Sequence, residues 1–198
     1  PLDPGQLPAP TDLRAEIMPG GAIHLQWRTA AQYEGLLRYS VYGATQDTLK
    51  PSAEDLLGTA DDCRLTYRAS RSNVRYTFAV AAGLAGVDGD GSISEPVRLA
   101  TGELPPPQPP QQATATLRID GSVRLTYELP PGTRSGGVGV LRSRQAIDPS
   151  APAGETVPVR QSPGGESLLA PPSSDRHYAL SAKDPDGGPP AVLPLQAR

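Results

Sequence analysis

The residues most able to do chemistry in this chain form a short acidic loop, Asp88-Gly89-Asp90-Gly91-Ser92-Ile93. Alternating carboxylates followed by a glycine fit the centre of a calcium-binding loop, in which oxygen ligands surround the ion. In that alignment the first ligand position is Gly86 and the last is Val97, so the first carboxylate and the bidentate glutamate are both missing. We expect Asp88 and Asp90 to serve a turn, with a metal site as the alternative.

Nucleophilic and acid–base chemistry has few candidates in this chain. Its two histidines, His24 and His177, stand in strand-like segments where both should face solvent. The lone cysteine, Cys63, can form no disulfide within the chain and reads as a structural thiol. No Gly-x-Ser-x-Gly elbow, phosphate-binding glycine loop or paired-histidine motif occurs in the sequence. We therefore predict a protein that is not an enzyme and that holds no cofactor.

Binding is the chemistry that remains. Tyr33, in a loop, and Tyr42, facing outward on a strand, could stack on a sugar ring or on a partner protein. Arg142 and Arg144 lie on one face of a strand and could receive an acidic partner, with Arg134 nearby in the sequence. The alternative is that all of them are ordinary surface residues or contacts between domains.

The elements that would carry these residues are short strands, and the clearest of them occur twice. The segment Gly21-Ala22-Ile23-His24-Leu25-Gln26-Trp27 is matched about 100 residues later by Gly121-Ser122-Val123-Arg124-Leu125-Thr126-Tyr127. In the same way, Tyr76-Thr77-Phe78-Ala79-Val80 is matched by Tyr178-Ala179-Leu180. Apolar and polar residues alternate in these segments, with an aromatic residue at a fixed place. The chain therefore contains one type of β-domain twice.

Composition supports an all-β fold with two domains. The 24 prolines and 21 glycines are spread along the chain and separate short apolar runs, as turns do between strands. We predict a linker over 1–10, a domain over 11–102, a proline-rich linker over 103–110 and a second domain over 111–198. The prolines of 103–110 favour a semi-rigid polyproline II spacer, and the alternative is that they pack at the start of the second domain.

The strand pattern resembles the fibronectin type III family. The matching features are Trp27 on the second strand, Tyr39-x-Val41-Tyr42 on the third and Tyr76-x-Phe78-x-Val80-x-Ala82 on the sixth. In the second domain the resemblance is partial, and Tyr127 stands in place of the usual tryptophan. It implies two immunoglobulin-like β-sandwiches in tandem. Trp27 would fill the space between the sheets, and the hydroxyls of Tyr76 and Tyr178 would bond to backbone at a tyrosine corner.

Charge and hydropathy limit the partners. The formal net charge is −3, with 9 Lys and Arg against 13 Asp and Glu over residues 1–103, and 9 against 8 over residues 104–198. Neither half has the basic excess that binding to a phosphate backbone requires. No apolar run approaches the roughly 20 residues that cross a bilayer. We predict neither nucleic-acid binding nor membrane insertion.

Together these features predict a non-catalytic tandem module that acts as a spacer or as a protein–protein interaction segment. We expect it to be part of a larger surface or secreted protein, and its disulfide-free, Ala/Pro/Gly/Arg-rich sequence suggests a bacterial one. The alternative is an adhesion module that recognises a carbohydrate or other ligand through exposed tyrosines. The expected location is extracellular or at the cell surface, and a cytoplasmic location stays open.

Overall fold

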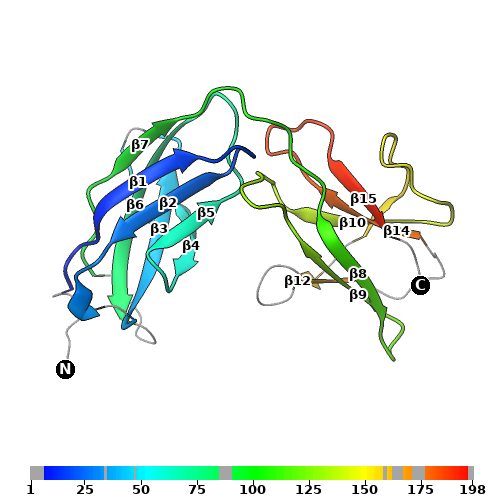
Figure 1. Ribbon diagram of the computed structural model, residues 1–198, viewed down its shortest axis with the longest axis horizontal. Coiled ribbons are helices and arrows are strands. Elements are labelled where there is room, and N and C mark those ends of the chain that lie inside the picture. Colours follow the sequence, from blue (N-terminus) through cyan, green and yellow to red (C-terminus); the bar gives the residue numbers. More distant parts are fainter. Residues whose placement is uncertain are drawn as a thin grey trace. The chain divides into compact units, whose positions relative to one another are not determined.

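Strands make up almost all of the secondary structure in the described part of the chain. The computed structural model describes residues 7–33, 35–46, 48–84, 91–157, 160–161, 167–170 and 177–195. The chain divides into two units (Figure 1). Unit 1 contains Pro1–Met18, Ala22–Tyr67 and Arg71–Leu104, and unit 2 contains Pro19–Gly21, Arg68–Ser70 and Pro105–Arg198. The two short segments of unit 2, Pro19–Gly21 and Arg68–Ser70, have no sequence pattern that links them to the C-terminal half.

The described part of unit 1 is a β-sandwich of seven strands. They are β1 (Thr11–Ile17), β2 (Ile23–Arg28), β3 (Leu37–Ala44), β4 (Leu56–Ala60), β5 (Arg64–Tyr67), β6 (Arg75–Leu84) and β7 (Val97–Ala100). One antiparallel sheet has the order β1-β2-β5 and the other β4-β3-β6-β7. Alternation sets the inner faces: in β2, Ile23, Leu25 and Trp27 are buried, whereas Gln26 and Arg28 are exposed. The predicted all-β sandwich is confirmed.

Aromatic side chains fill the space between the two sheets of unit 1. The edge of the Trp27 indole meets Tyr39 with ring centroids 5.3 Å apart, and Tyr76 stacks on Phe78 at 5.6 Å. Aromatic pairs in these geometries stabilise a core beyond the area that they bury. Leu7 also lies in this core and is 2% exposed. Residues 7–10 are part of unit 1.

Tyr76 makes the hydrogen bond of a tyrosine corner. Its hydroxyl accepts a hydrogen bond of 2.8 Å from the backbone N–H of Arg71, five residues upstream. The ring is 3% exposed, so the bond satisfies two polar groups that water reaches poorly. Tyr178 of unit 2 is buried in the same way, at 8%. The segment 171–176 before Tyr178 lies outside the described residues, so its corner stays a prediction.

Tyr67, at the end of β5, should make the stability of unit 1 depend on alkaline pH. Burial, and next the neighbouring Tyr76, raise the pKa of Tyr67 to about 12, while Arg71 acts in the opposite direction. In the unfolded chain a tyrosine ionises near its ordinary value of about 10. The contribution of the protonated Tyr67 to the free energy of unfolding is therefore complete below pH 10. It is lost between about pH 10 and 12, where the unfolded chain releases the Tyr67 proton and the folded chain keeps it.

Urea unfolding at a series of pH values should show this loss for the natural chain. In Tyr67→Phe the free energy of unfolding should fall less steeply between about pH 10 and 12, because phenylalanine has no proton to release. NMR titration of the Tyr67 ring reports the ionisation directly. A midpoint near pH 10 in the folded chain would contradict the prediction.

The described part of unit 2 contains eight strands in two sheets. They are β8 (Gln111–Leu117), β9 (Val123–Glu128), β10 (Val138–Ser143), β11 (Glu155–Val157), β12 (Arg160–Gln161), β13 (Ser167–Ala170), β14 (His177–Ala182) and β15 (Ala191–Leu195). The sheets have the orders β12-β13-β9-β8 and β11-β10-β14-β15. In β10 the face that carries Val140 points to the main core of unit 2, where Val140 is fully buried. Leu141, on the opposite face, packs against a small separate cluster around Ile147.

The first hairpin of each unit repeats in structural detail. In β1 and β2, Arg14 pairs with Gln26 and Ile17 with Ile23, and in β8 and β9 the residues numbered 100 higher make the same pairs. Each first strand has a bulge at its second residue, where Asp12 and Gln112 have φ of 53° and 49°. The backbone, and not only the sequence pattern, is therefore duplicated.

The proline-rich segment packs along one side. From Leu104 every third residue is buried, namely Leu104, Pro107 and Pro110, and the residues between them are exposed. A period of three is the repeat of polyproline II. The N–H of Gln108 also donates to Thr133 Oγ1 at 3.1 Å. Residues 105–110 belong to unit 2 and are packed within it, which is the alternative that the sequence left open.

Candidate functional site

The acidic loop that could bind calcium cannot be placed. Asp88 and Asp90 lie in segment 85–90, outside the described residues. Among the residues that are described, no group of three or more histidine, cysteine or carboxylate side chains is arranged to hold a metal ion. The structure also contains, in its described part, no helix long and apolar enough to span a bilayer.

The two candidate tyrosines are less available than the sequence suggested. Tyr33 ends a short 3-10 helix, Ala31–Tyr33, whose turn returns the ring to the core, where it packs partly buried against the main cluster of unit 1. Tyr42 is half-buried on β3. Neither is the fully exposed aromatic platform that stacking on a sugar would use.

The candidate arginines have different surroundings. Arg142, on β10, is held by Glu155 of the neighbouring strand β11: its Nε and one terminal nitrogen lie 3.2 and 3.0 Å from Glu155 Oε2. Arg144 follows β10 and is exposed. Arg142 therefore already has an acidic partner within its own sheet, because β11 pairs beside β10.

Arg134 is the residue whose role the sequence did not show. Its side chain is 3% exposed and lies between two carboxylates of one turn, with nitrogen–oxygen distances of 3.1 Å to Asp184 and 2.6 Å to Asp186. Its Nε also donates to the carbonyl of Pro105 at 2.6 Å. These carboxylates belong to the turn Asp184–Gly187, in which Gly187 N–H donates to Asp184 O and Gly187 has φ of 82°. Arg134 receives acidic groups from its own chain, so its role is structural.

Two segments from the N-terminal half of the sequence complete this part of unit 2. Gly20 O accepts a hydrogen bond of 2.9 Å from Arg134 N–H, and Ser70 O lies 3.4 Å from the Arg134 guanidinium. Arg68 donates to the carbonyl of Thr133 at 2.8 Å, and its own carbonyl accepts from Ser135. These bonds involve backbone groups in segments between strands, which leave no periodic pattern in a sequence.

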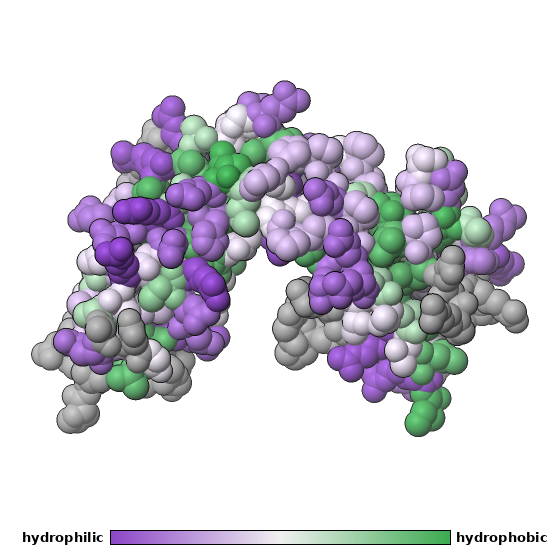
Figure 2. Space-filling view, viewed as in Figure 1, coloured by the Kyte–Doolittle hydropathy of each residue, from purple (hydrophilic) through white to green (hydrophobic). Residues whose placement is uncertain are grey.

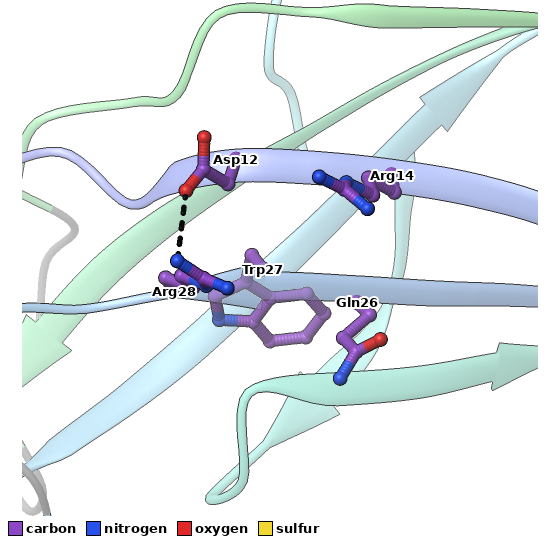
Figure 3. A pocket seen from close by; sticks show the side chains of 5 residues that line it. All are labelled: Asp12, Arg14, Gln26, Trp27 and Arg28. Carbon is purple, nitrogen blue, oxygen red and sulfur yellow. Dashed lines mark ion pairs between the residues drawn. The ribbon is translucent and has the colours of Figure 1, made fainter.

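The outer face of β1 and β2 carries polar side chains around a shallow surface depression (Figure 3). Asp12, Arg14, Gln26, Trp27 and Arg28 line it. Arg28 pairs with Asp12 at 3.6 Å, and their side chains are 78% and 56% exposed, so the pair contributes little to stability. Arg14 lies directly opposite Gln26. Charges of both signs and an amide suit polar contact with another protein surface.

The second exposed feature is apolar and was not predicted. In the hairpin of β8 and β9, Leu117 is 74% exposed and Ile119 is fully exposed. The sequence sign of a turn here is Asp120-Gly121. Gly121 N–H donates to Arg118 O at 3.0 Å, so Ile119 stands within the turn, beyond the end of β8.

The strand orders of the two units and the tyrosine corner of unit 1 are those of the fibronectin type III-like β-sandwich fold. No family model matches the chain, and no curated protein matches it. Among solved structures, the chain is similar to the FN1–FN3 domains of chicken CNTN1. The sequences are 14% identical, the match covers 97% of this chain and 68% of that chain, and the TM-score is 0.38.

Proposed function

We propose that this chain is a non-catalytic tandem β-sandwich module that serves as a spacer or protein–protein interaction segment in a larger surface or secreted protein. Its disulfide-free, Ala/Pro/Gly/Arg-rich composition favours a bacterial source for that protein. The observation that supports this most is how the polar side chains are used. Those that are buried, such as Arg134, Ser70 and Thr101, bond to nearby backbone or to an acidic turn. Exposed polar side chains such as Arg14 and Gln26 lie on the outer sheet faces, where another molecule can reach them.

Recognition of a carbohydrate or other ligand through Tyr33 and Tyr42 has less support. Tyr33 packs against the core of unit 1, and Tyr42 is half-buried. The outer face around Arg14 and Gln26 is a better contact surface, because its side chains are exposed and carry both charge and hydrogen-bonding groups. This favours a protein as the partner.

Pulling on the full chain from its two ends tests the spacer function. A tandem of sandwiches should unfold in two separate events, each releasing roughly 340 Å of chain, because each unit has about 100 residues and an extended residue spans about 3.4 Å. One event that releases the whole length would contradict the proposal. Protease treatment of intact cells that carry the parent protein tests the location, since a surface segment is cleaved and a cytoplasmic one is protected.

A further inference from the structure

The strand β8 is an open sheet edge without charged residues. It is the end strand of its sheet, and among the described residues no strand pairs with its outer side. Its seven residues, Gln-Gln-Ala-Thr-Ala-Thr-Leu, include no charge, and all are exposed except Ala113, which is half-buried. Natural edge strands are usually protected by charged side chains, prolines or cover, because an open edge pairs with other strands.

The duplicate hairpin in unit 1 shows what protection looks like. The strand β1 is also the end strand of its sheet and has the same bulge, but it carries Asp12, Arg14 and Glu16 where β8 has Gln112, Thr114 and Thr116. Its last residue, Ile17, is 39% exposed, whereas Leu117 at the same place is 74% exposed. The two copies share a backbone and differ in the side chains that discourage strand pairing.

An apolar projection continues from this edge. Leu117 and Ile119 stand at the tip of the hairpin, which Figure 2 shows as an apolar projection from the surface of unit 2. Arg118 is the one charged residue between Gln111 and Ile119. Exposed aliphatic side chains beside an open edge add burial of apolar surface to the backbone hydrogen bonds that the edge can offer.

Hydrogen bonding within the hairpin shows which backbone groups point outward. The N–H of Arg118 donates to Ser122 O at 2.8 Å, so it points toward β9. In an antiparallel pair this direction alternates along the strand. The N–H and C=O groups of Thr114 and Thr116 therefore point toward β9, and those of Ala115 and Leu117 point toward the open side.

We propose that β8 pairs with β8 of a second copy of this chain, antiparallel about a two-fold axis at Thr116. In this register Ala115 of each copy lies opposite Leu117 of the other, and the outward groups of both residues exchange hydrogen bonds. A small side chain then faces a large one. Thr116 faces Thr116, a cross-strand pair that can form a hydrogen bond between hydroxyls. Thr114 faces Arg118, so no like charges meet.

The second copy fits this edge because the edge is complementary to itself. A two-fold interface uses the same patch on both partners, and the small-to-large alternation of Ala115 and Leu117 is matched when the strand is reversed. The inference goes beyond the proposed function by naming a partner. A chain that stays monomeric would overturn it and would leave the spacer function standing.

Sedimentation equilibrium of the full chain over a range of concentrations tests the pairing. We expect a reversible dimer, and Leu117→Lys should weaken it at least about tenfold, because the lysine removes apolar burial and adds charge at the edge. Ala115→Pro should do the same by removing an outward N–H. The matched controls on β1, Ile17→Lys and Ala15→Pro, should leave the dimer unchanged. A monomer at about 1 mM, or a dimer that Leu117→Lys leaves intact, would overturn the proposal.

A cysteine placed at the axis gives a second readout that does not depend on affinity. In a Cys63→Ser background, Thr116→Cys should form a disulfide between copies, because facing residues of a pair without hydrogen bonds have Cα atoms about 4.5 Å apart, within the range of a disulfide. Glu16→Cys, its counterpart on β1, should not. If both variants cross-link equally, the contact is random and the proposal fails.

Discussion

Replacing Arg134 with methionine is expected to lower the free energy of unfolding of unit 2 by about 3–5 kcal/mol. The guanidinium is 3% exposed, and the carboxylates of Asp184 and Asp186 that hold it are 9% and 28% exposed. Methionine has a similar length and no charge, so both carboxylates lose their cation and the carbonyl of Pro105 loses the Arg134 N–H that it accepts from. A carboxylate kept from water and without its cation is far less stable than an exposed one.

Urea unfolding followed by circular dichroism measures this loss, and the single tryptophan, Trp27, reports unit 1 separately by fluorescence. The free energy of unfolding of Arg134→Lys should lie between those of the natural chain and Arg134→Met. The lysine ammonium keeps the charge but lacks the planar guanidinium that reaches several acceptors. Arg144→Met removes an exposed arginine of the same unit, outside the β8 edge, and should change stability by less than about 0.5 kcal/mol. A loss below about 1 kcal/mol for Arg134→Met would show that the buried pairs contribute little.

The burial of Arg134 illustrates what the sequence could not show. Its neighbours, from Pro130 to Gly136, have no strand periodicity, and its acidic partners stand about 50 residues later. The turn that holds Asp184 and Asp186 is a local feature, because Asp, Pro and Gly at these positions favour a turn by themselves. The pairing of that turn with a buried cation depends on the arrangement of strands that only the folded chain supplies.

Strand faces were predictable wherever alternation was long enough to be unambiguous. In β2 the apolar residues of the alternating pattern, among them Trp27, are buried and the residues between them are more exposed. In β6 the aromatic residues Tyr76 and Phe78 are buried, but so are the residues between them, because this strand is covered on both faces. The prediction was less successful at the ends of elements. Tyr33 was expected in an exposed loop, and a short 3-10 helix returns its ring to the core. Ile119 follows the alternation of β8 but lies beyond its last residue, so no facing sheet covers it.

Duplication makes these differences informative, because one hairpin serves as a control for the other. The bulge, the pairing register and the turn are the same in both copies, so these features are set by the backbone pattern that the sequences share. The charged residues of β1 and the exposed aliphatic residues of β8 differ on the same backbone. Differences of this kind concern the surface, and therefore partners rather than folding.

Replacing Trp27 with alanine is expected to lower the free energy of unfolding of unit 1 by about 3–5 kcal/mol. The indole is 2% exposed and lies between the sheets with its edge against Tyr39, so its removal leaves a cavity that the rigid β-sandwich closes only in part. Truncation of a large buried aromatic loses both its transfer free energy and its packing contacts.

Trp27→Phe separates the contribution of ring packing from that of the indole nitrogen. Within the described part of the chain, the buried Trp27 Nε1 has no hydrogen-bond partner. A buried donor without an acceptor costs about 1–3 kcal/mol, and phenylalanine removes that donor while leaving a smaller cavity than alanine does. The two effects oppose each other, so the net loss should be below about 2 kcal/mol.

Hydrogen exchange of the β2 and β3 amides measures both Trp27 variants without tryptophan fluorescence. Gln26→Ala, next to Trp27 on the exposed face of the same strand, should change stability by less than about 0.5 kcal/mol. If Trp27→Phe lost as much as Trp27→Ala, the indole nitrogen would have to be bonded in the folded protein. A bonded nitrogen would mean that the sandwich of unit 1 holds a polar partner, such as a buried water, beside its largest side chain.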